Sequence, residues 1–160
     1  MNDKQITQLS QEEVNEASRK IACEITQNYL GALDIITFSN GGLWTVANIS
    51  KYLLHKPNVF SLGNANEIDD VGIIEMLQDG KYPWGFGHNV IIIDDILDSG
   101  STVQKINEEI NNFSSIFNES NLFHYFLVSK YPRFSNMYTP KKYFAPISID
   151  DKWIVFPWEQ

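Results

Sequence analysis

Residues 90–102, VIIIDDILDSGST, constrain the fold more than any other segment of this 160-residue chain. Val90 to Ile93 form an uninterrupted β-branched run, which is typical of a strand buried on both faces in a parallel sheet. Asp94 and Asp95 follow at the point where we expect this strand to end. The small residues from Ser99 to Thr102 then supply a turn before a helical stretch. The segment therefore predicts a strand–loop–helix unit of an α/β fold.

This unit carries the side chains of a binding site. Open α/β sheets bind ligands at the loops that follow the carboxyl ends of their strands. Free amides at the start of a helix suit a phosphate group, and neighbouring carboxylates suit sugar hydroxyls or a hard cation such as Mg²⁺. No Gly-Lys-Ser/Thr sequence is present, so the segment is not a Walker P-loop. The segment predicts a site for a phosphorylated sugar; the alternative is a βα turn whose acids only cap the helix.

The rest of the chain alternates between strand and helix patterns. Ser10 and Glu13 form a capping-box pattern, which is followed by apolar residues at helical spacing. We predict helices over 10–29, 43–54 and 103–112, and strands over 33–38, 59–62, 90–93 and 122–129. This order predicts a mostly parallel central sheet flanked by helices, in a single α/β domain over 1–160.

Two regions do not fit the alternation of strands and helices. Residues 63–88 are long for a connection, and long connections in compact domains are often functional, so we interpret them as an active-site loop, with a short helix at 68–78. Residues 131–160 are rich in aromatics and prolines and show no clear helix. We predict a core over about 1–130 and a small C-terminal hood, residues 131–160, folded over the carboxyl end of the sheet.

Composition narrows the classes of partner. The formal charge of −8 argues against a nucleic-acid-binding protein, which needs a basic face. Only two arginines occur, so phosphate binding has to depend on backbone amides, hydroxyls, lysine and metal. The single cysteine, Cys23, excludes an internal disulfide and fits a reducing compartment. No stretch is long and apolar enough for a membrane span, so we expect a soluble, cytoplasmic protein without a membrane partner.

A second polar turn lies at Ser39, Asn40, Gly41 and Gly42. It also follows a predicted strand and precedes a predicted helix, so its amides can form another anion cradle. The alternative is a glycine turn that only backbone geometry requires.

The 90–102 segment resembles the phosphoribosyl-pyrophosphate (PRPP) motif of type I phosphoribosyltransferases, in which an apolar strand and two acids precede Thr/Ser-Gly-x-Thr. The resemblance implies the fold of that family, Mg²⁺ as cofactor, and ribose and metal binding by Asp94 and Asp95. It implies 5′-phosphate binding by Asp98, Ser99, Gly100, Ser101 and Thr102. Asp98 would also accept the proton of the purine N7. Ser39 to Gly42 resembles the family's pyrophosphate loop, with Asn40 where arginine is common.

The C-terminal sequence resembles bacterial xanthine-guanine and related 6-oxopurine phosphoribosyltransferases. Lys130 ends a predicted strand, and a Trp-x-x-x-Pro-Trp-Glu pattern runs from Trp153 to Glu159. By this resemblance Lys130 donates to the purine O6, Trp153 stacks on the ring, and the backbone of Ile154 meets the N1/N2 edge. Core packing is the alternative for both tryptophans, and for Trp158 we prefer it.

The leading hypothesis is therefore a purine phosphoribosyltransferase that joins guanine, xanthine or hypoxanthine to PRPP. The resemblance also implies self-association as a dimer or tetramer. Two departures motivate a second hypothesis. The 63–88 loop carries one lysine, Lys81, against five acids, where the family brings basic residues over the pyrophosphate, and Asn40 stands where arginine is common. The second hypothesis is a catalytically weak or inactive regulatory module that binds PRPP or a nucleotide. A third, weaker hypothesis is a transferase with a different acceptor, such as a pyrimidine.

Overall fold

A computed structural model describes residues 5–61, 89–113, 122–130 and 137–160 of the chain. The elements in these ranges are β1 (Ile6–Gln8), α1 (Gln11–Asn28), β2 (Leu33–Thr37), α2 (Ser39–Ser50), β3 (Asn58–Ser61), β4 (Asn89–Leu97), α4 (Ser101–Phe113), β5 (Phe123–Lys130), β6 (Tyr143–Phe144), β7 (Ile147–Ile149), β8 (Trp153–Val155) and the 3₁₀ helix η1 (Pro157–Glu159). The loop predicted at 63–88 lies outside the described residues, as does the helix predicted within it.

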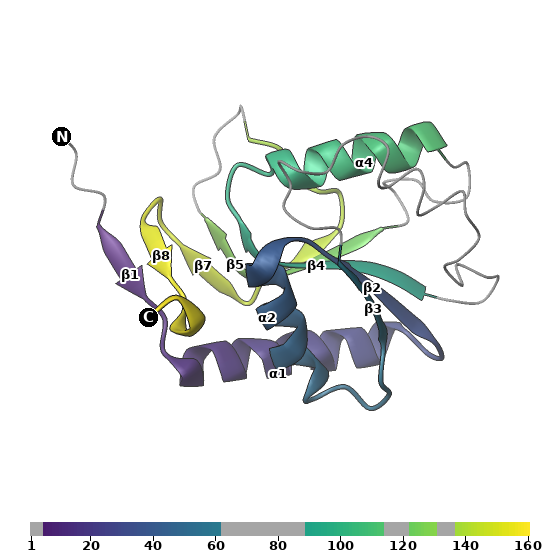
Figure 1. Cartoon of the computed structure of the whole chain (residues 1–160), viewed down its shortest axis with the longest axis horizontal. Coiled ribbons are helices and arrows are strands. Elements are labelled where there is room, and N and C mark those ends of the chain that lie inside the picture. The colour runs from purple at the N-terminus through teal and green to yellow at the C-terminus, as the bar shows by residue number, and fades with distance from the viewer. Residues whose placement is uncertain (1–4, 62–88, 114–121, 131–136) are drawn as a thin grey trace.

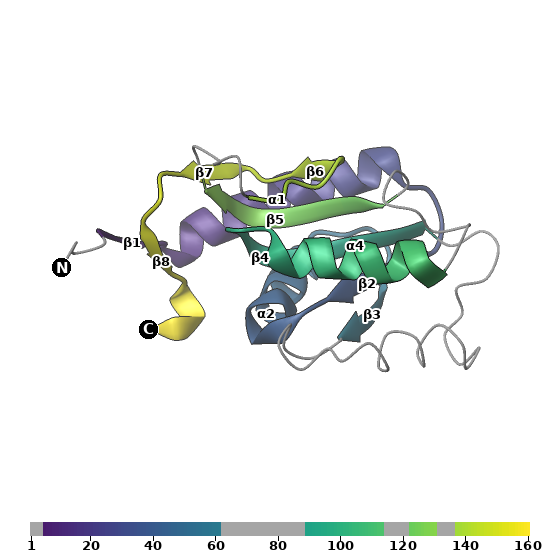
Figure 2. The ribbon, with the colours of Figure 1, turned by 90° about the horizontal axis from the view of Figure 1, so that it is seen from above.

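The described strands form one larger sheet and one small one. The larger sheet has the order β3-β2-β4-β5-β6, with β7 also paired to β5, and each of these pairs is parallel. Helix α4 covers one face of this sheet, whereas α1 and α2 cover the other (Figures 1 and 2). The predicted α/β class and the central parallel sheet flanked by helices are therefore confirmed.

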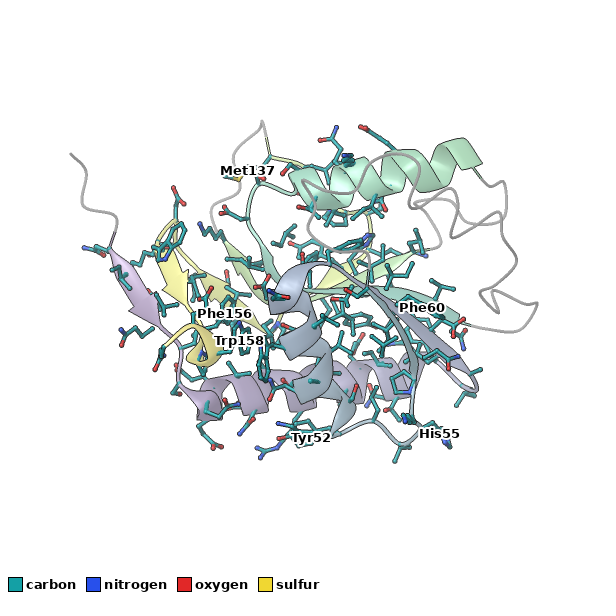
Figure 3. The ribbon with its side chains drawn as sticks, in the orientation of Figure 1. Tyr52, His55, Phe60, Met137, Phe156 and Trp158 are labelled. Atoms are coloured by element: carbon teal, nitrogen blue, oxygen red, sulfur yellow. The ribbon has the colours of Figure 1, made fainter. Side chains whose placement is uncertain are left out.

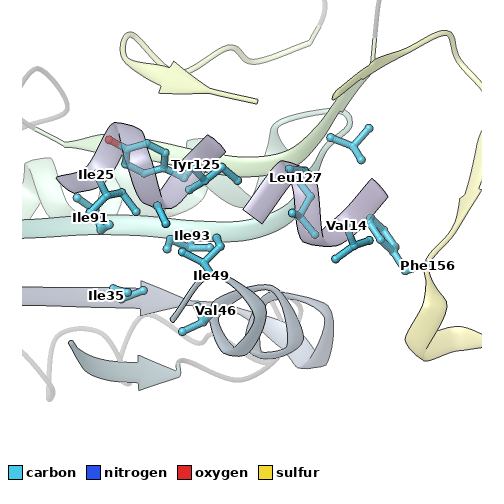
Figure 4. Close-up of a cluster of buried hydrophobic side chains, with 14 of the residues drawn as sticks. Val14, Ile25, Ile35, Val46, Ile49, Ile91, Ile93, Tyr125, Leu127 and Phe156 are labelled. Carbon is cyan, nitrogen blue, oxygen red and sulfur yellow. The ribbon is translucent and has the colours of Figure 1, made fainter. Parts of the chain in front are cut away.

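Helix α1 follows the capping box expected at its start. The Ser10 hydroxyl accepts a hydrogen bond from the Glu13 amide at 3.2 Å, and the Glu13 carboxylate accepts one from the Ser10 amide at 2.8 Å. Buried residues of α1, among them Val14 and Ile25, pack with Ile91 and other apolar side chains of the central strands (Figure 4). This burial of β-branched side chains on both sides of the helix–sheet contact fixes α1 against the sheet.

Three predicted boundaries were wrong by several residues, and two of these errors concern the polar motifs. Residues 39–42 are not a separate turn, because α2 already begins at Ser39, and it ends at Ser50 rather than at residue 54. Strand β4 does not end before Asp94 but continues through both carboxylates to Leu97, with Asp94 opposite Phe126 and Ile96 opposite Val128 on β5. In both places the regular hydrogen bonding of the backbone continues, so the polar residues belong to a helix and to a strand.

The C-terminal hood is only partly a cap. Strands β6 and β7 extend the main sheet beyond β5, because both pair with β5 in parallel. Strand β8 pairs with β1, a strand that we did not predict, and this pair lies with η1 toward the carboxyl ends of β4 and β5 (Figure 1). Among the described helices none is both long and apolar enough to span a lipid bilayer.

Candidate functional site at the carboxyl ends of the strands

The two carboxylates of β4 lie against the first turn of α2. A Cβ atom on Gly41 would collide with the Asp95 carboxylate, and one on Gly42 would collide with the Thr37 hydroxyl and come within 3.0 Å of Asp94 Oδ1. Glycine is therefore required at both positions for close approach, rather than for a turn. The structure thus brings the predicted ribose and pyrophosphate residues together.

The residue that precedes the first turn of α2 contributes no side-chain cap to it. Its N-cap residue is Phe38, whose side chain makes no capping hydrogen bond. Helix N-termini carry partial positive charge and amides without intrahelical partners, so they favour an anion. The Asp95 carboxylate lies at this position beside Gly41. A bound pyrophosphate would therefore meet both the helix terminus and a carboxylate, an arrangement that requires a cation between them.

Burial disfavours the charged forms of Asp94 and Asp95. Asp94 is only 9% exposed, and desolvation followed by the charge of Asp95 raises its pKa well above the ordinary value. Desolvation also raises the pKa of Asp95, and the more distant charge of Glu159 acts in the same direction. The buried Thr37 hydroxyl beside Asp94 has no hydrogen-bond partner among the described residues. This part of the site therefore favours a ligand that brings positive charge and hydrogen-bond donors.

The loop between β4 and α4, with the first turn of α4, contains the residues that we predict to bind the 5′-phosphate. Gly100 adopts a φ of +78°, a left-handed conformation that favours glycine. The Ser99 and Ser101 hydroxyls are 3.0 Å apart, and the Ser101 amide donates to the Ser99 hydroxyl at 3.3 Å. A cavity of about 210 Å³, which we call the carboxyl-edge cavity, is lined by residues 94–103 in the part of the chain that the structure describes. Hydroxyls and amides at the start of α4 can therefore contact a single small anion.

Tyr138 of the hood holds this loop in place, a contact that the sequence analysis missed. Its backbone N–H donates to the Ser99 carbonyl at 2.9 Å, and its phenol accepts from the Asn107 amide at 2.9 Å. Its carbonyl lies where a Cβ atom on Gly100 would be. The preceding residue, Met137, lies beside the start of α4 (Figure 3). Only a tyrosine downstream of the last long strand marked this contact in the sequence, which is too weak a signal to identify it.

Lys130 ends β5 beside the same loop. Its side chain is 6% exposed, and its ammonium donates to Asp98 Oδ2 at 2.9 Å. The ammonium also lies 3.6 Å from Asp151 Oδ1 of the hood, so two half-exposed carboxylates compensate one buried charge. The structure therefore joins the predicted proton acceptor, Asp98, to the predicted purine-binding lysine. Asp151 is a third member of this charged cluster, and we did not predict it, although it lies only two residues before Trp153.

Trp153 and Ile154 lie in β8, at the edge of the small sheet. The Trp153 amide donates to Gln5 and the Val155 carbonyl accepts from Leu9, so these groups of β8 face β1. Because successive backbone groups of a strand alternate in direction, the N–H and C=O of Ile154 point to the opposite edge. The Trp153 ring is 59% exposed, which leaves it accessible to a ligand. Trp158 instead stacks on the buried Phe156, with 4.7 Å between the ring centroids, which agrees with the core packing that we preferred for this residue.

The carboxylate pair suits magnesium only together with a substrate. No group of three or more metal-binding side chains occurs among the described residues. Mg²⁺, however, is commonly held by one or two carboxylates plus substrate oxygens and waters. Asp94 and Asp95 supply two carboxylates whose raised pKa values a nearby cation would lower. The donor set therefore fits a magnesium ion that binds with an anionic ligand.

Comparisons with known proteins bear on the fold. No family model matches the sequence, and no curated protein gives a significant match. Solved structures do match: a hypothetical protein from Neisseria gonorrhoeae with bound ppGpp has a TM-score of 0.73 at 16% identity, over 100% of this chain and 92% of that chain. A purine phosphoribosyltransferase from Pyrococcus horikoshii has a TM-score of 0.63 at 24% identity, over 97% and 94%.

A third similar structure, the xanthine-guanine-hypoxanthine phosphoribosyltransferase of Helicobacter pylori, has a TM-score of 0.61 at 14% identity, over 98% of this chain and 93% of that chain. Identities this low establish a shared architecture and not a shared activity. The chain therefore has the type I phosphoribosyltransferase fold.

Proposed function

We propose that the protein is a Mg²⁺-dependent purine phosphoribosyltransferase that transfers the 5-phosphoribosyl group of PRPP to a 6-oxopurine. The products would be the nucleoside 5′-monophosphate and pyrophosphate. The observation that carries this proposal is the Lys130–Asp98 pair, held at 2.9 Å beside a phosphate cradle and a carboxylate pair.

This pair matches one edge of a 6-oxopurine. Neighbouring O6 and N7 atoms define that edge, and a donor beside an acceptor reads it when N7 carries a proton. The Lys130 ammonium is a donor without acceptor capacity, so it would donate to O6 and disfavour an amino group at the same position. The Asp98 carboxylate next to it would accept from N7–H. Trp153 and the outward backbone groups of Ile154 would then meet the ring face and the far edge.

The proposed reaction needs positioning more than covalent chemistry. The purine N9 forms a bond to ribose C1, while the bond from C1 to the pyrophosphate oxygen breaks and its electron pair leaves with pyrophosphate. Asp98 takes the N7 proton as this happens, which balances the charge on the ring. Asp94 and Asp95 orient the ribose hydroxyls, and residues 98–102 hold the 5′-phosphate. A magnesium ion bound at Asp94 and Asp95 would supply charge neutralisation for the leaving group.

Asp151 is a positioning residue in this scheme. It lies 3.6 Å from the Lys130 ammonium but is separate from the phosphate cradle. Once O6 takes one hydrogen bond of the ammonium and Asp98 turns to N7, Asp151 would still neutralise the buried lysine. We expect Asp151→Asn to raise KM for the purine more than it lowers kcat. Asp150→Asn is the matched control, because it removes the same charge at the exposed position next to Asp151.

The decisive test is a product assay with PRPP, Mg²⁺ and each of guanine, xanthine, hypoxanthine and adenine. Monophosphate from the oxopurines but not from adenine supports the proposal, and Asp98→Asn should then lower turnover by about 10²–10⁴-fold while PRPP binding survives. Turnover of Asp98→Asn equal to that of the unmodified protein would remove Asp98 from its proposed role. Product from a pyrimidine instead would favour a different acceptor.

A second candidate function is nucleotide binding without transfer. The similar Neisseria gonorrhoeae structure contains ppGpp, and in this chain Asn40 replaces the arginine common in pyrophosphate loops. A regulatory module predicts that GMP or ppGpp raises the melting temperature, while no product forms from any base over hours. Steady product formation would exclude this candidate, and silence with all four bases would favour it.

A further inference from the structure

A second cavity, which we call the α1–α2 cavity, has a volume of about 540 Å³ and lies between α1, α2 and the C-terminal η1. Among the described residues it shares no lining residue with the carboxyl-edge cavity. Its walls combine two indole rings with carboxamides and one lysine. The lining residues are Gln11, Asn15, Trp44, Ala47, Asn48, Lys51, Pro157, Trp158 and Gln160.

The aromatic wall is a fixed stack with one accessible end. The buried Phe156 ring stacks on Trp158 at 4.7 Å, and Trp158 lies nearly parallel to Trp44, at 6.4 Å between ring centroids and 10° between planes. Phe156 and Trp158 lie together beside α2 (Figure 3). Trp44 is 53% exposed, although aromatic rings of this size are usually buried. A planar ligand ring can therefore stack on an indole that the fold already holds in place.

The polar wall is organised by one buried amide. Asn48 is 5% exposed, and its Nδ2 donates to the Trp44 carbonyl at 2.9 Å. Its Oδ1 accepts from Lys51 Nζ at 3.0 Å and from Gln11 Nε2 at 3.4 Å. Gln11 Nε2 also donates to Asn15 Oδ1 at 3.0 Å. The network fixes donors and acceptors around the cavity before any ligand binds, which lowers the cost of ordering them.

Lys51 supplies a positive charge that no carboxylate of the described residues neutralises by an ion pair. Its only described partner is the neutral amide of Asn48, and no ion pair joins it to a carboxylate among the described residues. The chain as a whole carries a formal charge of −8, yet this lysine at the cavity wall has no acidic partner among the described residues. This charge suits an anion, whereas the neutral carboxamides, each a donor and an acceptor, suit the edge of a nucleobase.

We propose that the α1–α2 cavity is a second binding site, for a nucleoside phosphate. The base stacks at Trp44, the carboxamides of Gln11 and Asn15 meet its polar edge, and the phosphate lies at Lys51. This site is independent of the proposed transferase function, because none of these residues belongs to the carboxyl-edge cavity.

The test is equilibrium dialysis of the full chain with GMP and with AMP, together with tryptophan fluorescence. The substitutions are Trp44→Leu and Lys51→Gln, and Lys56→Gln is the control because Lys56 is an exposed lysine outside the cavity lining. We expect Lys51→Gln to weaken one class of nucleotide site about tenfold and Trp44→Leu to abolish its fluorescence quenching. Lys56→Gln should change neither. Circular dichroism confirms that each variant is folded, and the surface substitution Lys51→Gln tests the site even if Trp44→Leu does not fold.

Asp95→Asn separates the two sites. If the proposal holds, nucleotide still binds to Asp95→Asn at the site that Lys51→Gln weakens. Unchanged affinity and stoichiometry in both Trp44→Leu and Lys51→Gln would overturn the proposal, as would loss of all binding in Asp95→Asn. Binding of inorganic phosphate as tightly as GMP would overturn the assignment to a nucleoside, because the ring would then contribute nothing.

Discussion

The ion pairs of Lys130 permit a quantitative test that needs no substrate. The ammonium is buried, and its two carboxylate partners, Asp98 and Asp151, are 51% and 47% exposed. Removing every partner of a buried charge costs about 3–5 kcal/mol of folding stability. Removing one half-exposed carboxylate while the other remains costs about 1 kcal/mol, because solvent screens the lost pair.

The two substitutions should therefore be coupled. We expect Asp98→Ala and Asp151→Ala each to lower the free energy of unfolding by about 1 kcal/mol, and the double variant to lower it by about 3 kcal/mol or more. The coupling energy is then about 1 kcal/mol or more, above the scatter expected for independent sites. Urea denaturation followed by circular dichroism measures it as a shift of the midpoint at constant slope.

Lys130→Met provides the control for this cycle. A methionine of similar length removes the charge, so in this background the two carboxylates have no ammonium to compensate. The same double substitution should then cost less than about 1 kcal/mol. Additive costs with Lys130 present, or the full cost persisting in Lys130→Met, would refute the argument. Asp150→Ala tests whether any change in the connection between β7 and β8 has the same effect.

Three further predictions address the glycine, the buried carboxyl and the buried phenol. Gly100→Ala should lower the free energy of unfolding by about 2–3 kcal/mol, because φ is positive and the new Cβ atom would clash with Tyr138. Gly31→Ala, at φ +98° with open space around its Cβ, should lower it by only about 1 kcal/mol. Equal losses of stability in thermal melts would show that the contact with Tyr138 adds no cost. Burial and a neighbouring charge raise the pKa of Asp94, so its contribution to stability is present at low pH and is lost as pH rises through the folded-state pKa. Asp94→Asn should therefore stabilise the metal-free protein at pH 7 by about 0.5–2 kcal/mol and have little effect near pH 3. A variant that is less stable than the unmodified protein at pH 7 would contradict this reasoning. Burial also raises the pKa of Tyr125, so stability should fall above about pH 10, where this tyrosine ionises in the unfolded chain before it does in the folded one. Tyr125→Phe should reduce this fall in urea midpoints measured between about pH 9 and pH 11. An unchanged dependence on pH would exclude Tyr125 as the cause.

The fold was predictable because its signals are local. A capping box and an apolar stripe define α1, and an all-β-branched run defines β4, so the order of elements follows from short windows of sequence. The boundaries at 39–42 and 94–95 were not predictable in this way. A glycine pair normally weakens a helix, and acids normally end a strand, yet Gly41 and Asp95 are retained within regular elements because they pack against each other.

Members of the candidate site were predictable where they belong to a short, recognisable sequence motif. Residues 98–102 follow one another in the sequence and line a single cavity. Asp151 and Tyr138 contact the site from the hood, at separations of 21 residues from Lys130 and 39 residues from Ser99, counted along the sequence. No local pattern encodes such contacts, because they depend on how β6, β7 and β8 bring the hood back to β5.

The electrostatics of the site indicate which ligand would complete it. Asp94 and Asp95 are destabilised as charged groups by burial, so a cation beside them is favourable. The first turn of α2 favours an anion, but a carboxylate already lies there, so the anion has to arrive with that cation. Lys130, in contrast, is compensated by two acids and gains from a neutral acceptor that leaves one acid in place. The proposed substrates, a magnesium-bound phosphoribosyl pyrophosphate and a neutral 6-oxopurine, would meet these three requirements together, whereas a free cation would meet only the first and a free anion would meet none.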